Sequence, residues 1–326
     1  MTRHNRGALL LTLGLVVATL GIFQAAQAAG PLTTLSQTSV QGPALAIFNG
    51  RLYMAWTGTD NPNHLNVAYT TDGVNFSTPV VIPNNSSVNY AGPGLTAFNG
   101  KLYLSWTGGS ALVNYISSSD GVTWGNKVVT TWKTVRGTTL TVNSAGTVMY
   151  LGFSGLTSPY LIQLYNTSDG VNWGPYATEN YQGRGSVFSP TILGGPTGGV
   201  EVGFATLPTS GSFNPCPWDC IVLNGVTLVP GPLNAGVSAP GTTGTAGPGL
   251  GYFNSVLQIA WNGGFSGAQG TTPHIFIASS STYPMPYFNT NQACIGNPAL
   301  INYGGHLYMA WTGSDSGQHL NIQWVL

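Results

Sequence analysis

Residues 42–58 read GPALAIFNGRLYMAWTG, residues 92–108 read GPGLTAFNGKLYLSWTG, and residues 297–313 read NPALINYGGHLYMAWTG. Three weaker copies lie between them, near residues 135–155, 189–206 and 247–263. One aromatic residue near the end of each copy recurs about every 50 residues, a period typical of propeller blades. These aromatic residues are Trp56, Trp106, Phe153, Phe204, Trp261 and Trp311. The sequence therefore predicts six blades.

Each copy alternates apolar with small or polar residues, which is the period-2 signal of strands. In the first copy we expect strands at residues 44–48, 51–57, 64–70 and 78–82, with Asn49-Gly50 as a type I′ hairpin turn between the first two. No segment has a helical period. The predicted fold is all-β: a six-bladed β-propeller with four-stranded antiparallel blades.

The last copy is one strand short, because the chain stops after the segment at residues 321–325. Residues 32–39 precede the first inner strand and have no partner in their own blade. If this N-terminal strand is the outer strand of the last blade, the ring closes and no sheet edge is left open. We therefore predict closure of the ring by the N-terminal strand.

The N-terminus has the pattern of a secretory signal peptide. Arg3 and Arg6 form a basic start, residues 8–23 are apolar, and Ala26-Gln27-Ala28 is a cleavage site of the A-x-A type. The alternative, an uncleaved membrane anchor, is disfavoured because the apolar run is short for a span of about 20 residues. We expect residues 1–28 to be removed and residues 29–326 to form a single propeller domain, secreted or at the cell surface.

Only 5% of the residues are charged, against about 25% in ordinary soluble domains. Such a surface has no electrostatic field for nucleic acid or for an anionic membrane. It suits neutral polar ligands such as sugars, and it equally suits an inert extracellular scaffold. We expect a monomer that needs no cofactor.

The chain has three cysteines. Cys216 and Cys220 enclose three residues and, in an oxidising compartment, predict a small loop disulfide. A metal site is disfavoured because this spacing has no histidine nearby. Cys294 is left over, either as a buried thiol or as the true partner of one of the other two; we expect it to be unpaired.

Three turns carry a family resemblance. Residues 70–76, 118–124 and 167–173 each place Asp-Gly-Val shortly before Phe or Trp. They resemble Asp boxes, one residue shorter than the usual pattern, and so the chain resembles the Asp-box (BNR-repeat) propellers, a superfamily that includes bacterial sialidases. The resemblance covers three of the six blades. It implies that Asp72, Asp120 and Asp169 are structural residues that satisfy turn amides.

The resemblance does not extend to the sialidase catalytic set. That set requires an arginine triad, a Tyr–Glu pair and an Asp, and the family also carries an Arg-Ile-Pro motif. No Arg-Ile-Pro occurs, and Arg51, Arg136 and Arg184 are the only arginines after residue 28, with Arg51 expected on the wrong face. A glycosidase in general needs two carboxylates flanking the bond. The carboxylates outside the Asp-Gly turns are Asp60, Glu179, Glu201, Asp219 and Asp315, and no close pair can be named among them.

In a propeller, the loops between the second and third strands share one face with the connections between blades. On that face the sequence places a group of polar and aromatic residues: Arg136, Arg184, Glu179, Trp132 and Tyr181. Sugars bind to such a combination, because an aromatic ring stacks on C–H groups while charged side chains hold hydroxyls. The alternative is that these are unrelated exposed loop residues.

Two equivalent loops in neighbouring blades repeat the same pair of residues. Asp60 and His64 lie in the first copy, and Asp315 and His319 lie in the last. They are either further ligand-binding residues or a repeated structural hydrogen bond between loop and strand. Together these observations favour a secreted, lectin-like module for neutral or weakly charged glycans. The alternatives are a divergent sialidase-like glycoside hydrolase and a non-catalytic structural or adhesive surface protein.

Overall fold

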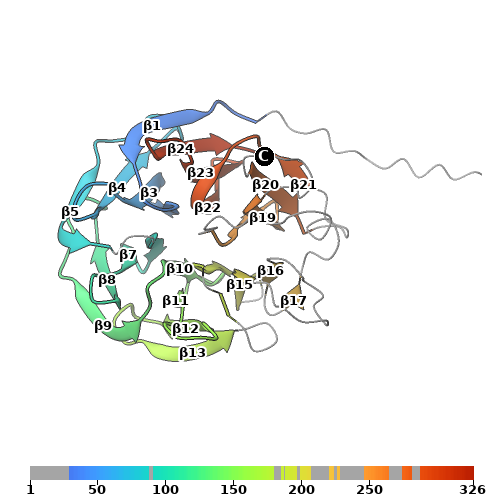
Figure 1. Cartoon of the computed structure of the whole chain (residues 1–326). Helices are drawn as coiled ribbons and strands as arrows, with labels where there is room; N and C mark the ends of the chain where they lie inside the picture. Colours follow the sequence, from blue (N-terminus) through green and yellow to red (C-terminus); the bar gives the residue numbers. More distant parts are fainter. Residues whose placement is uncertain are drawn as a thin grey trace, which may run out of the picture.

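The computed structural model describes residues 29–87, 91–179, 185–186, 188–196, 199–206, 220–223, 226–227, 246–263, 274–280 and 287–326. Within these ranges every regular element is a strand, and the strands form four-stranded antiparallel sheets, six in all. The sheets stand around a common centre, in the arrangement of a β-propeller (Figure 1). The same ranges contain no helix with the length and apolar character to cross a bilayer.

Each sheet begins at the centre with an inner strand followed by a second strand. The inner strands are β2 (Ala44–Phe48), β6 (Gly94–Phe98), β10 (Thr138–Val142), β14 (Thr191–Gly194), β18 (Gly249–Phe253) and β22 (Cys294–Tyr303). The second strands are β3 (Arg51–Thr57), β7 (Lys101–Thr107), β11 (Met149–Ser154), β15 (Val200–Thr206), β19 (Val256–Gly263) and β23 (His306–Gly313). At the first hairpin, Asn49 and Gly50 have φ of 49° and 72°, as a type I′ turn requires at both positions.

The third and outer strands complete the sheets. The third strands are β4 (His64–Thr70), β8 (Leu112–Ser118), β12 (Ile162–Thr167), β16 (Cys220–Leu223), β20 (His274–Ser279) and β24 (His319–Trp324). The outer strands are β5 (Val80–Ser86), β9 (Val128–Lys133), β13 (Gly174–Glu179), β17 (Val226–Thr227), β21 (Tyr287–Asn289) and β1 (Thr33–Thr38). The prediction of residues 78–82 for β5 therefore began two residues too early and ended four residues too early. A register shift between His64 and Asn66 lets β5 follow β4 back to its first residue.

The N-terminal strand β1 lies beside β24, near the end of the chain (Figure 1). The two strands are antiparallel, with Thr33 opposite Ile322 and Thr34 opposite Asn321. The Thr34 hydroxyl also donates a hydrogen bond to Asn321 Oδ1 at 2.7 Å. The sheet formed by β22, β23 and β24 thus obtains its fourth strand from the opposite end of the chain.

The repeated aromatic residues lie on the second strands and are buried, with exposed fractions of 0 to 6%. They form the cores between neighbouring sheets. Trp106, for example, packs in one cluster with Tyr53 of β3 and Leu95 of β6. The period of the sequence therefore reflects one large buried side chain for each interface between sheets.

A second repeated feature links the sheets by hydrogen bonds. The polar residue that follows the anchor aromatic donates its side-chain hydrogen to a backbone carbonyl in the connection into the next sheet or, for Cys294, at the start of the inner strand. These links join Thr57 to Ala91 (3.1 Å), Thr107 to Arg136 (2.5 Å), Ser154 to Phe188 (2.7 Å), Asn262 to Cys294 (2.8 Å) and Thr312 to Gln41 (2.6 Å). The Thr of the Trp-Thr-Gly motif is thus a link between sheets, which the sequence analysis did not anticipate.

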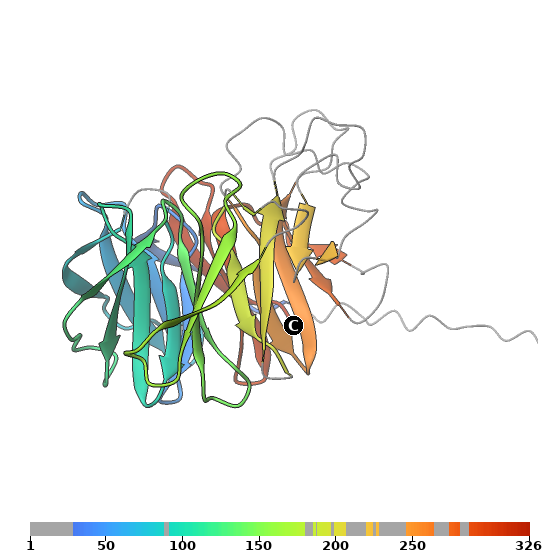
Figure 2. The ribbon, with the colours of Figure 1, turned by 90° about the horizontal axis from the view of Figure 1, so that it is seen from below.

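Seen from the side, the strands run between two opposite faces of the molecule (Figure 2). We call one the turn face: it carries the hairpins between inner and second strands, such as Asn49-Gly50, and the turns between third and outer strands, such as Asp72-Gly73. We call the other the loop face: it carries the loops between second and third strands, such as residues 58–63, and the connections between sheets, such as residues 39–43.

Candidate functional site

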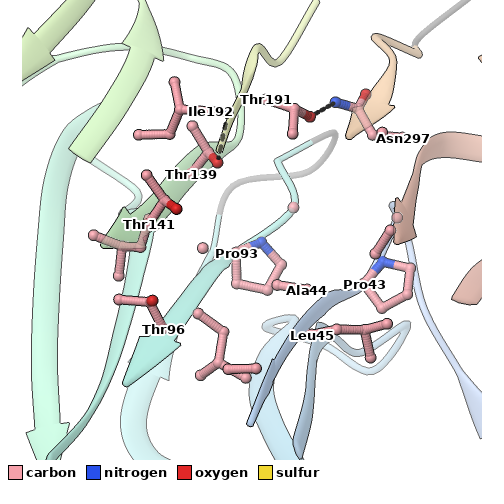
Figure 3. A pocket seen from close by; sticks show the side chains of 18 of the residues that line it. Pro43, Ala44, Leu45, Pro93, Thr96, Thr139, Thr141, Thr191, Ile192 and Asn297 are labelled. Atoms are coloured by element: carbon pink, nitrogen blue, oxygen red, sulfur yellow. Dashed lines mark hydrogen bonds between the residues drawn. The ribbon is translucent and has the colours of Figure 1, made fainter. Parts of the chain in front are cut away.

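A cavity of about 290 Å³ lies where the inner strands of the sheets meet. Every inner strand contributes to its wall. We call it the central pocket. Figure 3 shows it with the side chains of Thr96, Thr139 and Thr141 on one side and those of Pro43 and Leu45 on the other. The pocket is therefore amphipathic: three hydroxyl groups gather on one side, beside the aliphatic Ile192, and aliphatic groups lie opposite them.

The hydroxyl wall comes from two adjacent inner strands, β6 and β10. The Thr139 hydroxyl oxygen accepts a hydrogen bond from the Ile192 N–H at 3.3 Å, and that of Thr141 accepts one from the Gly194 N–H at 2.9 Å. Each of these hydroxyls can still donate its own proton. The Thr96 hydroxyl makes no hydrogen bond to any residue that the structure describes. Three donors in this wall are thus free to bind a ligand.

Asn297 and Thr191, by contrast, serve the fold at one end of the pocket. The Asn297 amide donates to Ser189 O at 2.9 Å and to Thr191 Oγ1 at 3.4 Å, and its Oδ1 accepts from the Gly247 N–H at 2.5 Å. Thr191 donates its hydroxyl to Pro248 O at 2.5 Å. Figure 3 marks the contact between these two side chains. They brace neighbouring inner strands and have little capacity left for a ligand.

Among its described lining residues, the central pocket has no Asp, Glu, Lys, Arg or His and no aromatic side chain. This lining therefore offers no general acid, no general base and no charged side chain that could bind an ionic group. Likewise, the described residues contain no group of three or more His, Cys, Asp or Glu placed to hold a metal ion. The chemistry that this wall supports is hydrogen bonding to neutral polar groups and van der Waals contact with C–H groups.

The carboxylates of the three Asp-Gly turns (Asp72-Gly73, Asp120-Gly121 and Asp169-Gly170) are occupied within their own turns. Asp120 Oδ1, for example, accepts hydrogen bonds from the N–H groups of Val122 at 2.8 Å and Thr123 at 2.6 Å, and from the Ser118 hydroxyl at 2.9 Å. These bonds to the charged form hold the pKa of Asp120 well below its usual value. The pKa values of Asp72 and Asp169 are lowered in the same way.

The two predicted Asp–His pairs are both formed on the loop face. Asp60 Oδ2 binds His64 Nδ1 and Asp60 Oδ1 accepts from the His64 N–H at 3.1 Å. Asp315 Oδ1 lies 2.9 Å from His319 Nδ1. Partial burial raises the pKa of Asp60, but the hydrogen bonds and charge of His64 outweigh it and leave this pKa below its usual value. The pKa of Asp315 is lowered by the same balance with His319. The repeated hydrogen bond between loop and strand is therefore present; a ligand role for these residues stays a prediction.

The segment after β1 brings these two loops together. The Ser39 N–H donates to Gln318 O and the Val40 N–H donates to Thr57 O, each at 3.0 Å. Thr38, which is paired with His319 across the strands, also places its hydroxyl 2.6 Å from that of Thr59. No pattern in the sequence indicated these two threonines, because their contact depends on the pairing of β1 with β24, strands from opposite ends of the chain.

The other predicted ligand-binding residues are only partly placed. Trp132, on β9, is partly buried and stacks on Tyr165 with ring centroids 3.9 Å apart, so that its indole fills the space between the second and third sheets. Arg136 is partly buried in the connection that follows β9, and its backbone carbonyl accepts the hydroxyl link from Thr107. Glu179 ends β13 opposite Ile162. Its side chain, Tyr181 and Arg184 lie outside the described residues, so convergence of the five stays a prediction.

The cysteine predictions are tested at one residue. Cys294 is a free, buried thiol, as expected, and burial raises its pKa. Cys216 and the side chain of Cys220 lie outside the described residues, and the predicted disulfide with them. Residues 1–28, with the predicted signal peptide, also lie outside.

No protein-family model matches the sequence. No curated protein matches it either. Solved propellers do resemble its fold. SapL1 lectin in complex with alpha methyl fucoside has a TM-score of 0.54 at 13% identity, over 85% of this chain and 90% of that one. A mutant of AofleA from Arthrobotrys oligospora has a TM-score of 0.52 at 10% identity, over 87% and 83%.

Trypanosoma rangeli sialidase in complex with the inhibitor DANA has a TM-score of 0.52 at 10% identity. The match covers 89% of this chain but 55% of the sialidase, and the chain likewise spans 61% of Bombyx mori GH32 beta-fructofuranosidase BmSUC1. At such low identity these likenesses show a shared propeller fold.

Proposed function

We propose that this chain is a secreted, monomeric, six-bladed Asp-box propeller that binds neutral or weakly charged glycans without hydrolysing them. The observation that carries the proposal is the central pocket, where the free hydroxyl donors of Thr96, Thr139 and Thr141 face an aliphatic wall. A sugar has the same two characters, since its hydroxyls need hydrogen-bond partners and its C–H groups need apolar contact. An uncharged wall also holds such a ligand without the cost of dehydrating a buried charge.

The size of the pocket supports a small ligand. Its volume of about 290 Å³ lies at the small end of the range of about 300–1,000 Å³ for small-molecule pockets. Among the similar structures, the SapL1 lectin is in complex with alpha methyl fucoside and matches over 90% of its own chain. A sugar ligand is therefore compatible with a propeller of this kind.

Three observations support the remaining parts of the proposal. Six sheets within the described residues, together with the pairing of β1 and β24, support a six-bladed ring closed by the N-terminal strand. The hydrogen bonds of Asp72, Asp120 and Asp169 support their assignment as Asp-box turns. The basic start, apolar run and Ala26-Gln27-Ala28 site support secretion.

The described pocket lining supports the non-catalytic part of the proposal. Glycoside hydrolysis requires two carboxyl groups on either side of the scissile bond. The described lining of the central pocket supplies neither of them. The carboxylates of the Asp-Gly turns are held by turn hydrogen bonds on the turn face, and those of Asp60 and Asp315 are held by histidines on the loop face.

A glycan array tests the proposal. We expect the purified protein to bind a set of neutral saccharides, and the double variant Thr96→Val and Thr141→Val to bind the same set at least tenfold more weakly. Thr78→Val is the matched control, because Thr78 is exposed and lies outside the pocket. No binding to any neutral saccharide, or equal binding by the double variant, would contradict the proposal. Release of sugar from a bound glycoside would support the hydrolase alternative.

A further inference from the structure

The central pocket is bordered on the loop face by six equivalent residues, five of them one or two positions before an inner strand and the sixth within β22. We call them the collar: Gly42, Gly92, Gly137, Ser189, Gly247 and Asn297. Five of the six precede a proline, the exception being Gly137. Four of the six are glycine, which suggests that side chains have no room at this level of the channel.

Neighbouring collar residues touch through their backbones. A Cβ on Gly42 would overlap with Asn297 O, and one on Gly92 would lie 2.8 Å from Gly42 O. A Cβ on Gly137 would lie 2.7 Å from Gly92 O. Real Cβ atoms do not make contacts this short. In this half of the collar, neighbouring backbones therefore lie as close together as two chains can, and only glycine fits there.

Hydrogen bonds connect the remaining collar residues to one another and to the first half. The Gly137 N–H donates to Ser189 Oγ at 2.8 Å, and the Asn297 amide donates to Ser189 O at 2.9 Å. The Gly247 N–H donates to Asn297 Oδ1 at 2.5 Å. A Cβ on Gly247 would overlap with Ser189 O. The collar is thus an unbroken ring of contacts through all six sheets.

Such a ring is too narrow for a sugar. Six equal discs in mutual contact enclose a hole of the size of one disc, and the short Cβ contacts at the collar glycines show that neighbouring backbones are in van der Waals contact. The Asn297 side chain occupies part of this opening, since its amide reaches both Gly247 and Ser189. A pyranose ring with its hydroxyls is wider than the opening that remains.

The opposite end of the pocket meets solvent. At the collar end, Gly42 and Pro43 are buried. Ile47 lines the same pocket further along β2, and its side chain is 40% exposed. Because β2 runs from the loop face to the Asn49-Gly50 hairpin, this exposure places the mouth of the pocket on the turn face. The mouth therefore lies on the side opposite the loops where the sequence analysis expected the ligand.

We propose that the central pocket is blind, closed by the collar and open on the turn face, and that it takes the terminal residue of a neutral saccharide. This inference rests on the proposed glycan-binding function and specifies how that site is used. A blind pocket cannot let a saccharide chain pass through, so the residue that it holds must be an end of the chain. Its volume of about 290 Å³ fits a terminal residue better than a long segment.

Three tryptophan variants locate the mouth. Ile47→Trp adds bulk at the proposed mouth, Val122→Trp adds it on the turn face away from the pocket at a residue 48% exposed, and Thr59→Trp adds it on the exposed loop face. The probe is an array of neutral oligosaccharides tethered through the reducing end. We expect Ile47→Trp to lose at least tenfold in affinity, and the other two to bind as the parent does. Should Ile47→Trp lower the melting temperature, Ile47→Phe takes its place.

A competition experiment tests terminal recognition. The methyl glycoside of the terminal residue of the best array ligand should displace that ligand completely. Binding that resists this competitor, or that is lost in Thr59→Trp and kept in Ile47→Trp, would overturn the blind pocket while leaving the glycan-binding function intact. A parent protein that binds no saccharide at all would instead overturn the proposed function, and the inference with it.

Discussion

At the Asp-Gly turns, the polar groups are consumed by the fold: each aspartate binds two backbone N–H groups and a hydroxyl of its own turn. In the central pocket, Thr96, Thr139 and Thr141 keep hydroxyl donors that the fold does not use. In these two regions, the charged carboxylates stabilise turns and the neutral hydroxyls face the pocket. In this chain, therefore, the described carboxylates of the turns belong to the scaffold, and uncharged hydroxyls are the groups left available to a ligand.

The largest effect is expected from breaking a turn. Gly121 has φ of 78°, and a Cβ there would overlap with the Tyr53 hydroxyl of the preceding sheet. Gly121→Ala should lower the free energy of unfolding by about 2–5 kcal/mol, through the left-handed backbone and the overlap together. Gly100→Ala is the matched control, because Gly100 has φ of 70° and open space around it, and should cost about 1–2 kcal/mol. Chemical denaturation of both variants measures the difference, and equal losses would refute the close approach.

A pair of isosteric variants compares a structural hydroxyl with a free one. Thr107 is fully buried and its hydroxyl donates to Arg136 O, so Thr107→Val should cost about 1–3 kcal/mol of stability by leaving that carbonyl unpaired. Thr96→Val should change the free energy of unfolding by less than about 0.5 kcal/mol. Chemical denaturation of the two variants measures the two changes in free energy of unfolding. An equal loss of stability in both would contradict the distinction between a structural and a free hydroxyl.

For ligand affinity we expect the opposite order: Thr96→Val should have a larger effect than Thr107→Val. Thr96→Val removes a free donor from the pocket and should weaken saccharide binding by about 2- to 10-fold. Thr107→Val leaves the pocket lining unchanged and should bind as the parent does at a temperature where it is folded. Titration calorimetry with the best array ligand measures both. Weaker binding by Thr107→Val alone would place the ligand elsewhere.

A smaller effect is expected from pH. The Asp72 carboxylate has a lowered pKa in the folded protein because Asn75, Val74 and Thr70 donate hydrogen bonds to it, whereas in the unfolded chain its pKa is about 3.9. Its stabilisation is therefore present above about pH 4 and is lost as the pH falls through the lowered pKa. Asp72→Asn should lower the melting temperature at pH 7, and the gap from the parent should narrow as the pH falls below 4. A gap that does not change with pH would contradict this role.

The fold could be predicted largely because the repeat marks the most buried position of each sheet. Trp56, Trp106 and Trp311 are buried as their repetition indicated, and the Asn49-Gly50 turn has the dihedral angles that its residue types favour. The partner of residues 32–39 could also be predicted, since both ends of the repeat were incomplete. The limits of β5 were missed because a bulge does not show in the alternation of residues.

The candidate site was harder to predict, for two physical reasons. Thr96, Thr139 and Thr141 read as ordinary strand residues, and only the meeting of inner strands from distant parts of the chain makes them one wall. Trp132 was expected to face a ligand, whereas its ring stacks on Tyr165 and packs against the core between two sheets. The composition suited a neutral polar ligand and equally an inert scaffold, and it carried no information on which strands would surround a ligand.

A crystal structure of the protein with the best array ligand bound shows directly whether the central pocket holds the sugar. We predict that the sugar lies in the central pocket, with its hydroxyls accepting hydrogen bonds from Thr96, Thr139 and Thr141 and its C–H groups against Leu45. A sugar bound instead on the loop face, beside Asp60, His64, Asp315 and His319, would contradict the account.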